Sequence, residues 1–278
     1  MNFNKIKKIF LVPIILFISS CSNGDHMQKT ESYQNLVNSI SEKNWVALAH
    51  KKTYFGHQSV GFNIIDGIKD IMSENKKIDL NIKETEDLND FSKPIFAHSR
   101  VGKNANISSK LEDFENLIRQ GLGEKIDIAF FKFCYVDITE KTDVQKLFES
   151  YKQTMNNLQK EFPKTIFIFA TVPLRTVITT WKTGIKKLFG KDYIWEYADN
   201  IKRNEFNEMI RHEYATSGRL FDIARAESTY PDGSQEIFKL NGKRYASLIP
   251  EYTNDGGHLN KKGGKAIAAH LIALLAKI

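Results

Sequence analysis

The sequence predicts an α/β fold, a three-layer α/β/α sandwich with a mostly parallel sheet of about five strands. The main observation is that short apolar runs alternate along the chain with segments whose apolar residues recur at helical spacing. A second observation is that two apolar runs, 126–133 and 165–171, are nearly continuous, as expected of strands covered on both faces. The chain after residue 33, about 245 residues, is long enough for one such domain.

The expected elements follow one another in this alternation. An apolar stretch at 53–55 predicts the first strand, and the helical spacing of apolar residues over 60–72 predicts a helix directly after it. By the same criteria we expect further strands at 78–82, 126–133, 165–171 and 220–223, and further helices at 107–118, 143–162, 200–214 and 261–276. Ligands of such sheets bind at the carboxyl ends of the strands, so a functional site is expected on that rim.

Two segments depart from the alternation. The first, 175–203, is a long net basic insertion. Its aromatic residues are Trp181, Phe189, Tyr193, Trp195 and Tyr197. These side chains either stack on sugar rings above a site or pack the insertion onto the domain. The second segment, 237–245, predicts a small hairpin with Asn241-Gly242 as its turn.

The N-terminus has the marks of a secretory signal. Lysines between residues 5 and 8 precede an apolar run at 9–18, which is too short for a comfortable membrane span. Residues 18–21 resemble the lipobox of bacterial lipoproteins, in which the cysteine is lipidated and becomes the mature N-terminus. We therefore expect a lipoprotein signal peptide at 1–20, lipidation of Cys21 and a polar tether at 21–33. An uncleaved anchor or an ordinary secreted protein is the alternative.

Charge and cysteine content narrow the class of protein. The formal net charge of +7 falls to +4 when the three lysines of the signal are removed, a diffuse excess that does not argue for nucleic acid. The lipoprotein resemblance implies lipid anchoring in the bacterial cell envelope, and Ser22 favours the outer membrane if the cell is Gram-negative. The cysteines are Cys21 and Cys134. Lipidation of the first leaves the second unpaired, so we expect no disulfide and a buried thiol at Cys134.

The most informative motif is Asp255-Gly256-Gly257-His258, directly before the final expected helix. An acid three residues before a histidine on a glycine-rich turn presents both groups from one loop, and the acid can fix the tautomer of the imidazole. Ser59 is the candidate nucleophile, because it lies where the first strand turns into a helix. The order serine, acid, histidine occurs in known triads. Taken singly, Ser59 also fits a helix N-cap, Asp255 a turn residue and His258 a structural histidine.

These residues resemble the SGNH (GDSL-like) family of hydrolases and acyltransferases, whose short sequence blocks are carried on a flavodoxin-like three-layer fold. Ser59 matches the nucleophile, although the Gly-Asp-Ser of the family reads Gly-His-Gln-Ser here. Asp255 and His258 match the closing Asp-x-x-His, and Gly102 matches the glycine of the second block. The resemblance implies that His258 is the base, that Asp255 orients it, and that the N–H of Gly102 helps to form the oxyanion hole.

The third block of the family matches poorly. Its Gly-x-Asn-Asp corresponds to 134–137, so Val136 stands where the family has the oxyanion asparagine. Valine has no side-chain donor, and loss of one such donor costs about a hundredfold or more in rate. Arg100, Lys132 and His57 are the nearest candidates to replace it or to bind substrate. Their plainer interpretations are a solvated or paired charge for Arg100 and Lys132, and a backbone-bonded histidine for His57.

The resemblance implies a serine esterase that needs no cofactor, and the sequence has no compact metal-ligand motif. We expect a lipid-anchored enzyme that removes O-acetyl or other short acyl groups from a carbohydrate. Its partners are then an acylated carbohydrate or another small ester and, through the lipid, a membrane. The alternative within catalysis is an O-acyltransferase acting on a cell-envelope polysaccharide, because a sugar hydroxyl can replace water. The alternative outside catalysis is a glycan-binding lipoprotein on the same fold.

Overall fold

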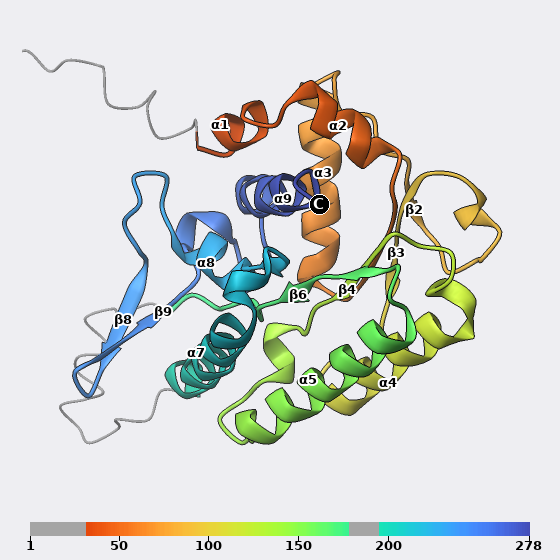
Figure 1. The fold of residues 1–278 in the computed structure, drawn as a ribbon. Coiled ribbons are helices and arrows are strands. Elements are labelled where there is room, and N and C mark those ends of the chain that lie inside the picture. Colours follow the sequence, from red (N-terminus) through yellow and green to blue (C-terminus); the bar gives the residue numbers. More distant parts are fainter. Residues whose placement is uncertain (1–31, 178–194) are drawn as a thin grey trace, which may run out of the picture.

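The parallel sheet expected from the sequence is present in the computed structural model, which describes residues 32–177 and 195–278 (Figure 1). Its strand order is β2-β3-β1-β4-β5, and all neighbouring pairs are parallel. These strands are β1 (Lys52–His57), β2 (Ile82–Glu84), β3 (Ile95–Arg100), β4 (Ile128–Phe131) and β5 (Ile166–Phe167). A second parallel pair is β6 (Phe169–Ala170) with β7 (Leu220–Phe221), and the expected antiparallel hairpin is β8 (Ile237–Leu240) with β9 (Lys243–Ala246).

Helices cover both faces of the sheet (Figure 1). One layer contains α1 (Ser32–Asn38), α2 (Glu42–Ala49), α3 (Val60–Glu74), α8 (Ile223–Ser228) and α9 (Lys261–Leu275). The other contains α4 (Ile107–Leu117), α5 (Val144–Glu161) and α7 (Trp195–Tyr214). Short 3₁₀ turns lie at Asp90–Ser92, Tyr135–Asp137, Ala215–Ser217 and Pro250–Tyr252, and a π turn at Ile118–Leu122.

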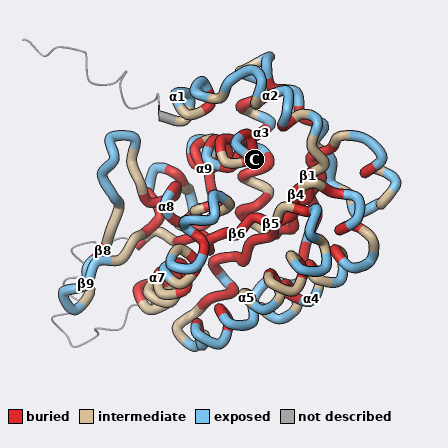
Figure 2. Tube along the Cα trace, viewed as in Figure 1, coloured by how far each residue is buried: buried red, intermediate tan, exposed pale blue. Residues whose placement is uncertain are grey.

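Successive residues of the central strands point to opposite faces, as the pleat of a strand requires. On β1, Tyr54 packs in the apolar cluster under α4 and α5, whereas Phe55 packs in the cluster under α3 and α9. On β4, Phe131 and Phe130 divide in the same way. The sheet is therefore buried on both sides (Figure 2), and the predicted three-layer α/β/α class is confirmed.

The strand β3, which lies beside β1, was not predicted. It contains His98 and Ser99, so it lacks the apolar run by which a buried strand is recognised. Both residues are nevertheless buried, because their side chains pair with polar groups of β1. Tyr54 Oη lies 2.6 Å from Ser99 Oγ, and His57 Nε2 lies 3.1 Å from His98 Nδ1. Side-chain hydrogen bonds between neighbouring strands therefore stabilise β3 where apolar side chains would be expected.

Three other boundaries differ from expectation. The strand predicted at 78–82 is wrong for most of its length, because Ile78 and Leu80 are buried in irregular chain before β2. The strand predicted at 220–223 ends early, because the side chain of Asp222 accepts a hydrogen bond from the N–H of Arg225 and begins α8. Helix α7 begins at Trp195, inside the segment that was expected to be an insertion.

Two glycines set the distance between α3 and α9. A Cβ atom on Gly67 would lie 2.2 Å from the carbonyl oxygen of Gly264, and one on Gly264 would lie 2.7 Å from that of Asn63. The two backbones are therefore in direct contact where the helices cross. Near this crossing, Lys265 Nζ lies 2.9 Å from a carboxylate oxygen of Glu74.

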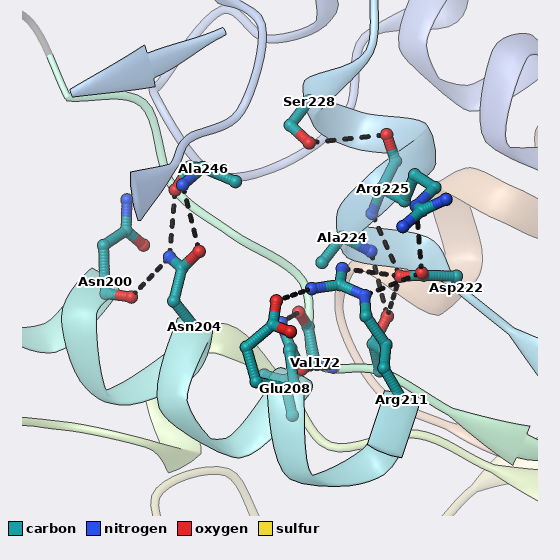
Figure 3. Close-up of polar contacts among 12 residues, drawn as sticks. Val172, Asn200, Asn204, Glu208, Arg211, Asp222, Ala224, Arg225, Ser228 and Ala246 are labelled. Carbon is teal, nitrogen blue, oxygen red and sulfur yellow. Dashed lines mark hydrogen bonds and ion pairs between the residues drawn. The ribbon is translucent and has the colours of Figure 1, made fainter. Parts of the chain in front are cut away.

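Polar side chains of α7 hold the C-terminal part of the domain in place. The Asn204 side chain donates to the carbonyl oxygen of Ala246 and accepts from its N–H, both at 3.0 Å (Figure 3). Arg211 makes two hydrogen bonds of 2.8 Å with the carboxylate of Asp222 (Figure 3). Because a bidentate pair fixes orientation as well as distance, α7 determines where β9 and α8 lie.

Several predicted features lie outside the described residues. They are the signal peptide at 1–20, Cys21, the tether up to residue 31, and Trp181, Phe189 and Tyr193. Of the aromatic residues of 175–203, Tyr197 is buried and stacks on Phe238 of β8, with ring centroids 5.1 Å apart. In the two described ranges, no helix has the length and apolar character needed to cross a membrane.

Replacing Gly67 by alanine tests the helix crossing. Alanine favours a helix by about 1 kcal/mol over glycine, but its methyl group would meet backbone atoms of Gly264. We expect a net destabilisation of about 1–3 kcal/mol, the usual cost of overpacking, measured as a lower urea midpoint. The control is Lys69→Ala on the exposed side of α3, which should stay within about 0.5 kcal/mol of wild type. A G67A variant as stable as wild type would rule out the close contact.

Candidate active site

Ser59 lies at the sharp turn between β1 and α3. Its backbone has φ 51° and ψ −112°, a positive φ that is strained by about 1–3 kcal/mol for a residue other than glycine. Its hydroxyl makes no capping hydrogen bond to α3, so Ser59 is not an ordinary N-cap. Gly61 lets the helix start close to β1, since a Cβ atom there would lie 2.3 Å from the ring of His57. A strained strand-to-helix turn of this kind exposes a nucleophile.

The turn that precedes α9 holds Asp255 against the ring of His258. Asp255 Oδ1 accepts hydrogen bonds from the N–H groups of Gly257 at 2.9 Å and His258 at 2.8 Å, and Oδ2 lies 2.6 Å from His258 Nδ1. Gly256 allows the turn by adopting φ 84°. Burial alone raises the pKa of Asp255, but the hydrogen bonds from the imidazole and the backbone outweigh it and hold the pKa below its ordinary range.

Ser59, His258 and Asp255 form an unbroken chain of hydrogen bonds. A carboxylate only accepts, so Nδ1 of His258 carries a proton and donates it to Asp255. Nε2 is then the acceptor for the hydroxyl of Ser59, whose oxygen lies 2.7 Å away. This tautomer can take the proton of the serine. The side chains of His258 and Asp255 are 48% and 55% exposed, so the triad is open to solvent.

Helices α3 and α9 bring these residues together across the chain. Helix α3 begins directly after Ser59, and α9 begins shortly after His258. The N–H of Leu259 donates to Asn63 Oδ1 on α3 at 3.1 Å, and the side chain of Asn260 caps the start of α9. The loop that carries Asp255 and His258 is therefore attached to the helix that follows Ser59.

The oxyanion side of the site differs from the expectation. Within the described chain, no group accepts a hydrogen bond from the N–H of Ser59 or Val60, which lie at the N-terminus of α3 and suit a negative charge. The N–H of Gly102, in contrast, donates to the carboxylate of Asp113 at 2.7 Å, so its predicted role as an oxyanion donor is corrected. Val136 is 36% exposed and offers no side-chain donor.

The carboxylate of Asp137 joins the loops of the second and third sequence blocks. It accepts from the N–H of Cys134 at 2.6 Å, from the N–H of Ala105 at 2.8 Å, and from Lys110 Nζ at 2.6 Å. The Lys110–Asp137 pair is buried, with side chains 1% and 0% exposed. Asp137 therefore supports the site from within and does not face a substrate.

His57 and Lys132 are enclosed in the interior, which corrects their predicted contact with substrate. His57 is 1% exposed and Lys132 2% exposed. Burial, together with the nearby charges of Lys132, His98 and Arg100, lowers the pKa of His57 to about 2. Burial also lowers the pKa of Lys132, whose Nζ lies 3.3 Å from Cys134 Sγ. The two side chains belong to a polar interior behind the rim of the sheet.

Arg100 stays at the surface but is engaged elsewhere. Its guanidinium lies 3.8 Å from the carboxylate of Glu84 and 4.8 Å from the ring centroid of Phe62. The paired-charge interpretation therefore describes Arg100. Cys134 is a free buried thiol, as expected. No three His, Cys, Asp or Glu side chains form a metal-ligand group anywhere in 32–177 or 195–278.

Sequence reasoning missed Tyr135. Its hydroxyl lies 3.5 Å from both ring nitrogens of His258, and the two rings meet edge to face with centroids 5.7 Å apart. The guanidinium carbon of Arg175 lies 5.5 Å from the tyrosine ring, and Arg175 Nε donates to the carbonyl oxygen of Gly256 at 3.3 Å. The only sequence signal for Tyr135 was its place directly before Val136 in the poorly matching block.

No family model matches the chain, and no curated protein sequence matches it. Solved structures resemble it at low identity. A protein named as a platelet activating factor from Streptococcus pneumonia has a TM-score of 0.45 and 14% identity, covering 89% of this chain and 94% of its own. A protein named as a lipolytic protein of the G-D-S-L family from Desulfitobacterium hafniense DCB-2 has a TM-score of 0.45 and 9% identity, covering 80% of this chain and 99% of its own. The periplasmic domain of a lipopolysaccharide acetyltransferase from Salmonella ser. Paratyphi A has a TM-score of 0.43 and 12% identity, covering 87% of this chain and 95% of its own. Scores this low assign no function, which has to be argued from the site.

Ser59 is expected to react as an activated nucleophile. A fluorophosphonate probe bonds to a serine oxygen that a neighbouring histidine deprotonates, so wild type should be labelled at Ser59 and Ser59→Ala should not. Asp255→Asn should slow labelling about a hundredfold or more, because an amide N–H facing Nδ1 favours the wrong tautomer. Fluorescence of the labelled protein over time gives the rates. Asp79→Asn, an exposed residue before β2, is the control, and equal rates for D255N and wild type would contradict the hydrogen-bond chain.

Glu227 on α8 is a second carboxyl group with an altered environment. It is fully buried, its Oε2 accepts from the N–H of Leu174 at 2.7 Å, and its Oε1 has no partner among the described residues. Burial raises the pKa of Glu227 to about 8, although that hydrogen bond and the charges of Lys132 and Arg203 oppose the rise. The folded protein therefore prefers the protonated carboxyl group.

This preference predicts a pH-dependent loss of stability. Because the folded pKa lies above the unfolded pKa of about 4.3, the contribution of Glu227 is complete below that pH and is lost as the pH rises towards the folded value. Glu227→Gln keeps an acceptor for Leu174 and cannot ionise. Between about pH 6 and pH 9, the melting temperature of wild type should therefore fall several degrees further than that of the variant. Calorimetry gives the melting temperatures. If those of wild type and variant fall equally with pH, Glu227 does not ionise in this range.

Proposed function

We propose that this protein is a serine esterase of the SGNH type, which removes O-acetyl or other short acyl groups from a carbohydrate. The observation that carries the proposal is the hydrogen-bond chain from Asp255 Oδ2 to His258 at 2.6 Å and from His258 Nε2 to Ser59 Oγ at 2.7 Å. A fixed acid, an imidazole in the basic tautomer and a serine on a strained turn together suit nucleophilic catalysis.

The proposed reaction has two stages. Ser59 Oγ attacks the acyl carbonyl carbon while its proton passes to His258 Nε2, and the negative charge that develops on the carbonyl oxygen is stabilised at the start of α3. His258 then gives the proton to the departing sugar oxygen, which leaves as a hydroxyl group. In the second stage a water oxygen bonds to the acyl carbon as His258 takes its proton, and that proton passes to Ser59 Oγ when the acyl group leaves as the acid. Asp255 remains ionised throughout, because its pKa lies below the ordinary range.

A carbohydrate ester is the substrate class that the surroundings favour. The exposed triad can reach an acyl group on a large molecule without enclosing the whole of it. A hollow of about 410 Å³ adjoins Asp255, and its lining includes Arg175, Thr176, Thr253 and Asn254. Hydroxyl, amide and guanidinium groups of this kind suit the hydroxyl groups of sugars.

The proposed setting is the bacterial cell envelope. The sequence before residue 22 supports it, because a basic segment and a short apolar run lead to Cys21 in a context that resembles a lipobox. A lipid on Cys21 would hold the domain at a membrane through the polar tether, in the outer membrane if the cell is Gram-negative. The substrate would then be an acylated glycan of the envelope or its surroundings.

One observation favours a second candidate, a non-catalytic glycan-binding protein. The N–H of Gly102 is taken by Asp113, and Val136 offers no donor, so the oxyanion side has lost two donors that the family resemblance implies.

Transfer of the acyl group to a polysaccharide hydroxyl uses the same triad as hydrolysis. Hydrolysis is favoured over transfer because water reaches His258 freely, its side chain being 48% exposed.

The test is acyl release by the purified protein. Wild type is incubated with 4-nitrophenyl acetate and with an O-acetylated polysaccharide, and 4-nitrophenol and acetate are measured. We expect turnover of both, and a loss of about a thousandfold or more in Ser59→Ala. Ser73→Ala is the matched control, because its exposed hydroxyl lies at the far end of α3 and donates to the carbonyl oxygen of Asp70.

The outcomes separate the candidates. Acetate release by wild type and Ser73→Ala, but not by Ser59→Ala, supports the esterase. Gain of acetyl groups by an added unacetylated glycan, with little free acetate, would instead identify a transferase. Glycan binding without turnover or fluorophosphonate labelling would identify the non-catalytic protein.

A further inference from the structure

We propose that the hydroxyl of Tyr135 is the oxyanion donor that replaces the missing side-chain amide at Val136. This inference rests on the proposed function. Tyr135 Oη lies 3.5 Å from Nε2 of His258, the same nitrogen that receives the proton of Ser59. Nδ1 donates to Asp255 and Nε2 accepts from Ser59, so neither ring nitrogen is available as an acceptor for the phenol. The hydroxyl is therefore next to the reacting atoms and free to turn towards a stronger acceptor.

The tyrosine is held firmly in this position. The side chain of Arg203, which is 1% exposed, donates from Nε to the carbonyl oxygen of Tyr135 at 2.8 Å. The guanidinium carbons of Arg175 and Arg203 lie 5.5 and 5.9 Å from the centroid of its ring. On the catalytic loop, a Cβ atom on Gly257 would lie 2.8 to 3.0 Å from Cζ, Oη and Cε1 of Tyr135. The absence of a side chain at Gly257 makes room for the phenol.

The phenol also keeps its proton. Tyr135 is only 8% exposed. Burial, and to a smaller extent the carboxylate of Asp255, raises its pKa, while Arg175 and Arg203 oppose the rise. A neutral phenol that is preorganised and largely desolvated is a good donor to a developing negative charge, and tyrosine is among the side chains that serve in oxyanion holes.

A replacement donor is needed because the site lacks two of the donors that the family resemblance implies. The N–H of Gly102 is bonded to Asp113, and Val136 has no donor, so the described site otherwise offers the N–H groups at the start of α3. As Ser59 Oγ bonds to the acyl carbon, its proton goes to His258 Nε2 and the π electrons of the carbonyl group move to its oxygen. Tyr135 donates a hydrogen bond to that oxygen and keeps its proton. When the intermediate collapses, the leaving oxygen takes the proton from His258.

The test compares Tyr135→Phe with wild type on 4-nitrophenyl acetate. Removing one oxyanion donor should lower kcat about a hundredfold and leave KM within about twofold, because the hydrogen bond forms mainly in the transition state. An alkyl trifluoromethyl ketone, which adds to the serine as an oxyanion, should bind the variant more weakly by a factor similar to the loss in kcat/KM. Tyr214→Phe is the control, since its buried hydroxyl has no partner among the described residues and lies on the opposite face of the sheet.

A positioning role for Tyr135 would give different readings. If the phenol only orients His258, Tyr135→Phe should shift the acid limb of the pH profile of kcat/KM and leave the affinity of the ketone unchanged, which would overturn the proposal. Unchanged kcat in the variant would overturn it as well. Melting curves identify a variant that fails to fold, and Tyr135→His, which restores a donor on a ring, then tests the role by partial recovery of ketone affinity. A wild type that neither cleaves the ester nor binds the ketone would overturn the proposed function itself.

Discussion

The contact of two helix backbones at Gly67 and Gly264 is the constraint on which the rest of the molecule depends. It brings α3 and α9 closer than any side chain between them would allow. Because α3 starts directly after Ser59 and α9 starts shortly after His258, this closeness places the two side chains within hydrogen-bond reach. The hydrogen bond from Leu259 to Asn63 then fixes the register of the loop on the helix.

The interior of the described domain also contains polar and charged side chains. Lys110 and Asp137 form a buried pair, and His57 lies against His98 between β1 and β3. Such groups are expensive to desolvate unless they are hydrogen-bonded, and these contacts reduce that cost. In return they connect the loops at the carboxyl ends of the strands, where apolar packing alone would leave loops free to shift. The rim is therefore held by directional bonds.

The fold class, and the pairing of Asp255 with His258, could be predicted because they depend on local patterns. Apolar periodicity gives the helices, and the spacing from Asp255 to His258 is a property of one short loop. Strand β3 could not be predicted, because His98 and its neighbours are buried by cross-strand partners that no local pattern reveals. The hydrogen bond of the Gly102 N–H could not be predicted either, because its acceptor, Asp113, lies eleven residues further along the chain. Tyr135 becomes a site residue only through a distant turn.

The long separation between Ser59 and His258 has a consequence for how the protein matures. The two residues are 199 positions apart, and His258 lies directly before α9, the final helix described. A chain that is still being synthesised would carry Ser59 without His258. Contacts between such distant segments form late, because the loop between them must close first. In the proposed esterase, Ser59 would therefore gain its reactivity only when α9 has docked on α3, so the first labelling of Ser59 by a serine probe would report that step of folding.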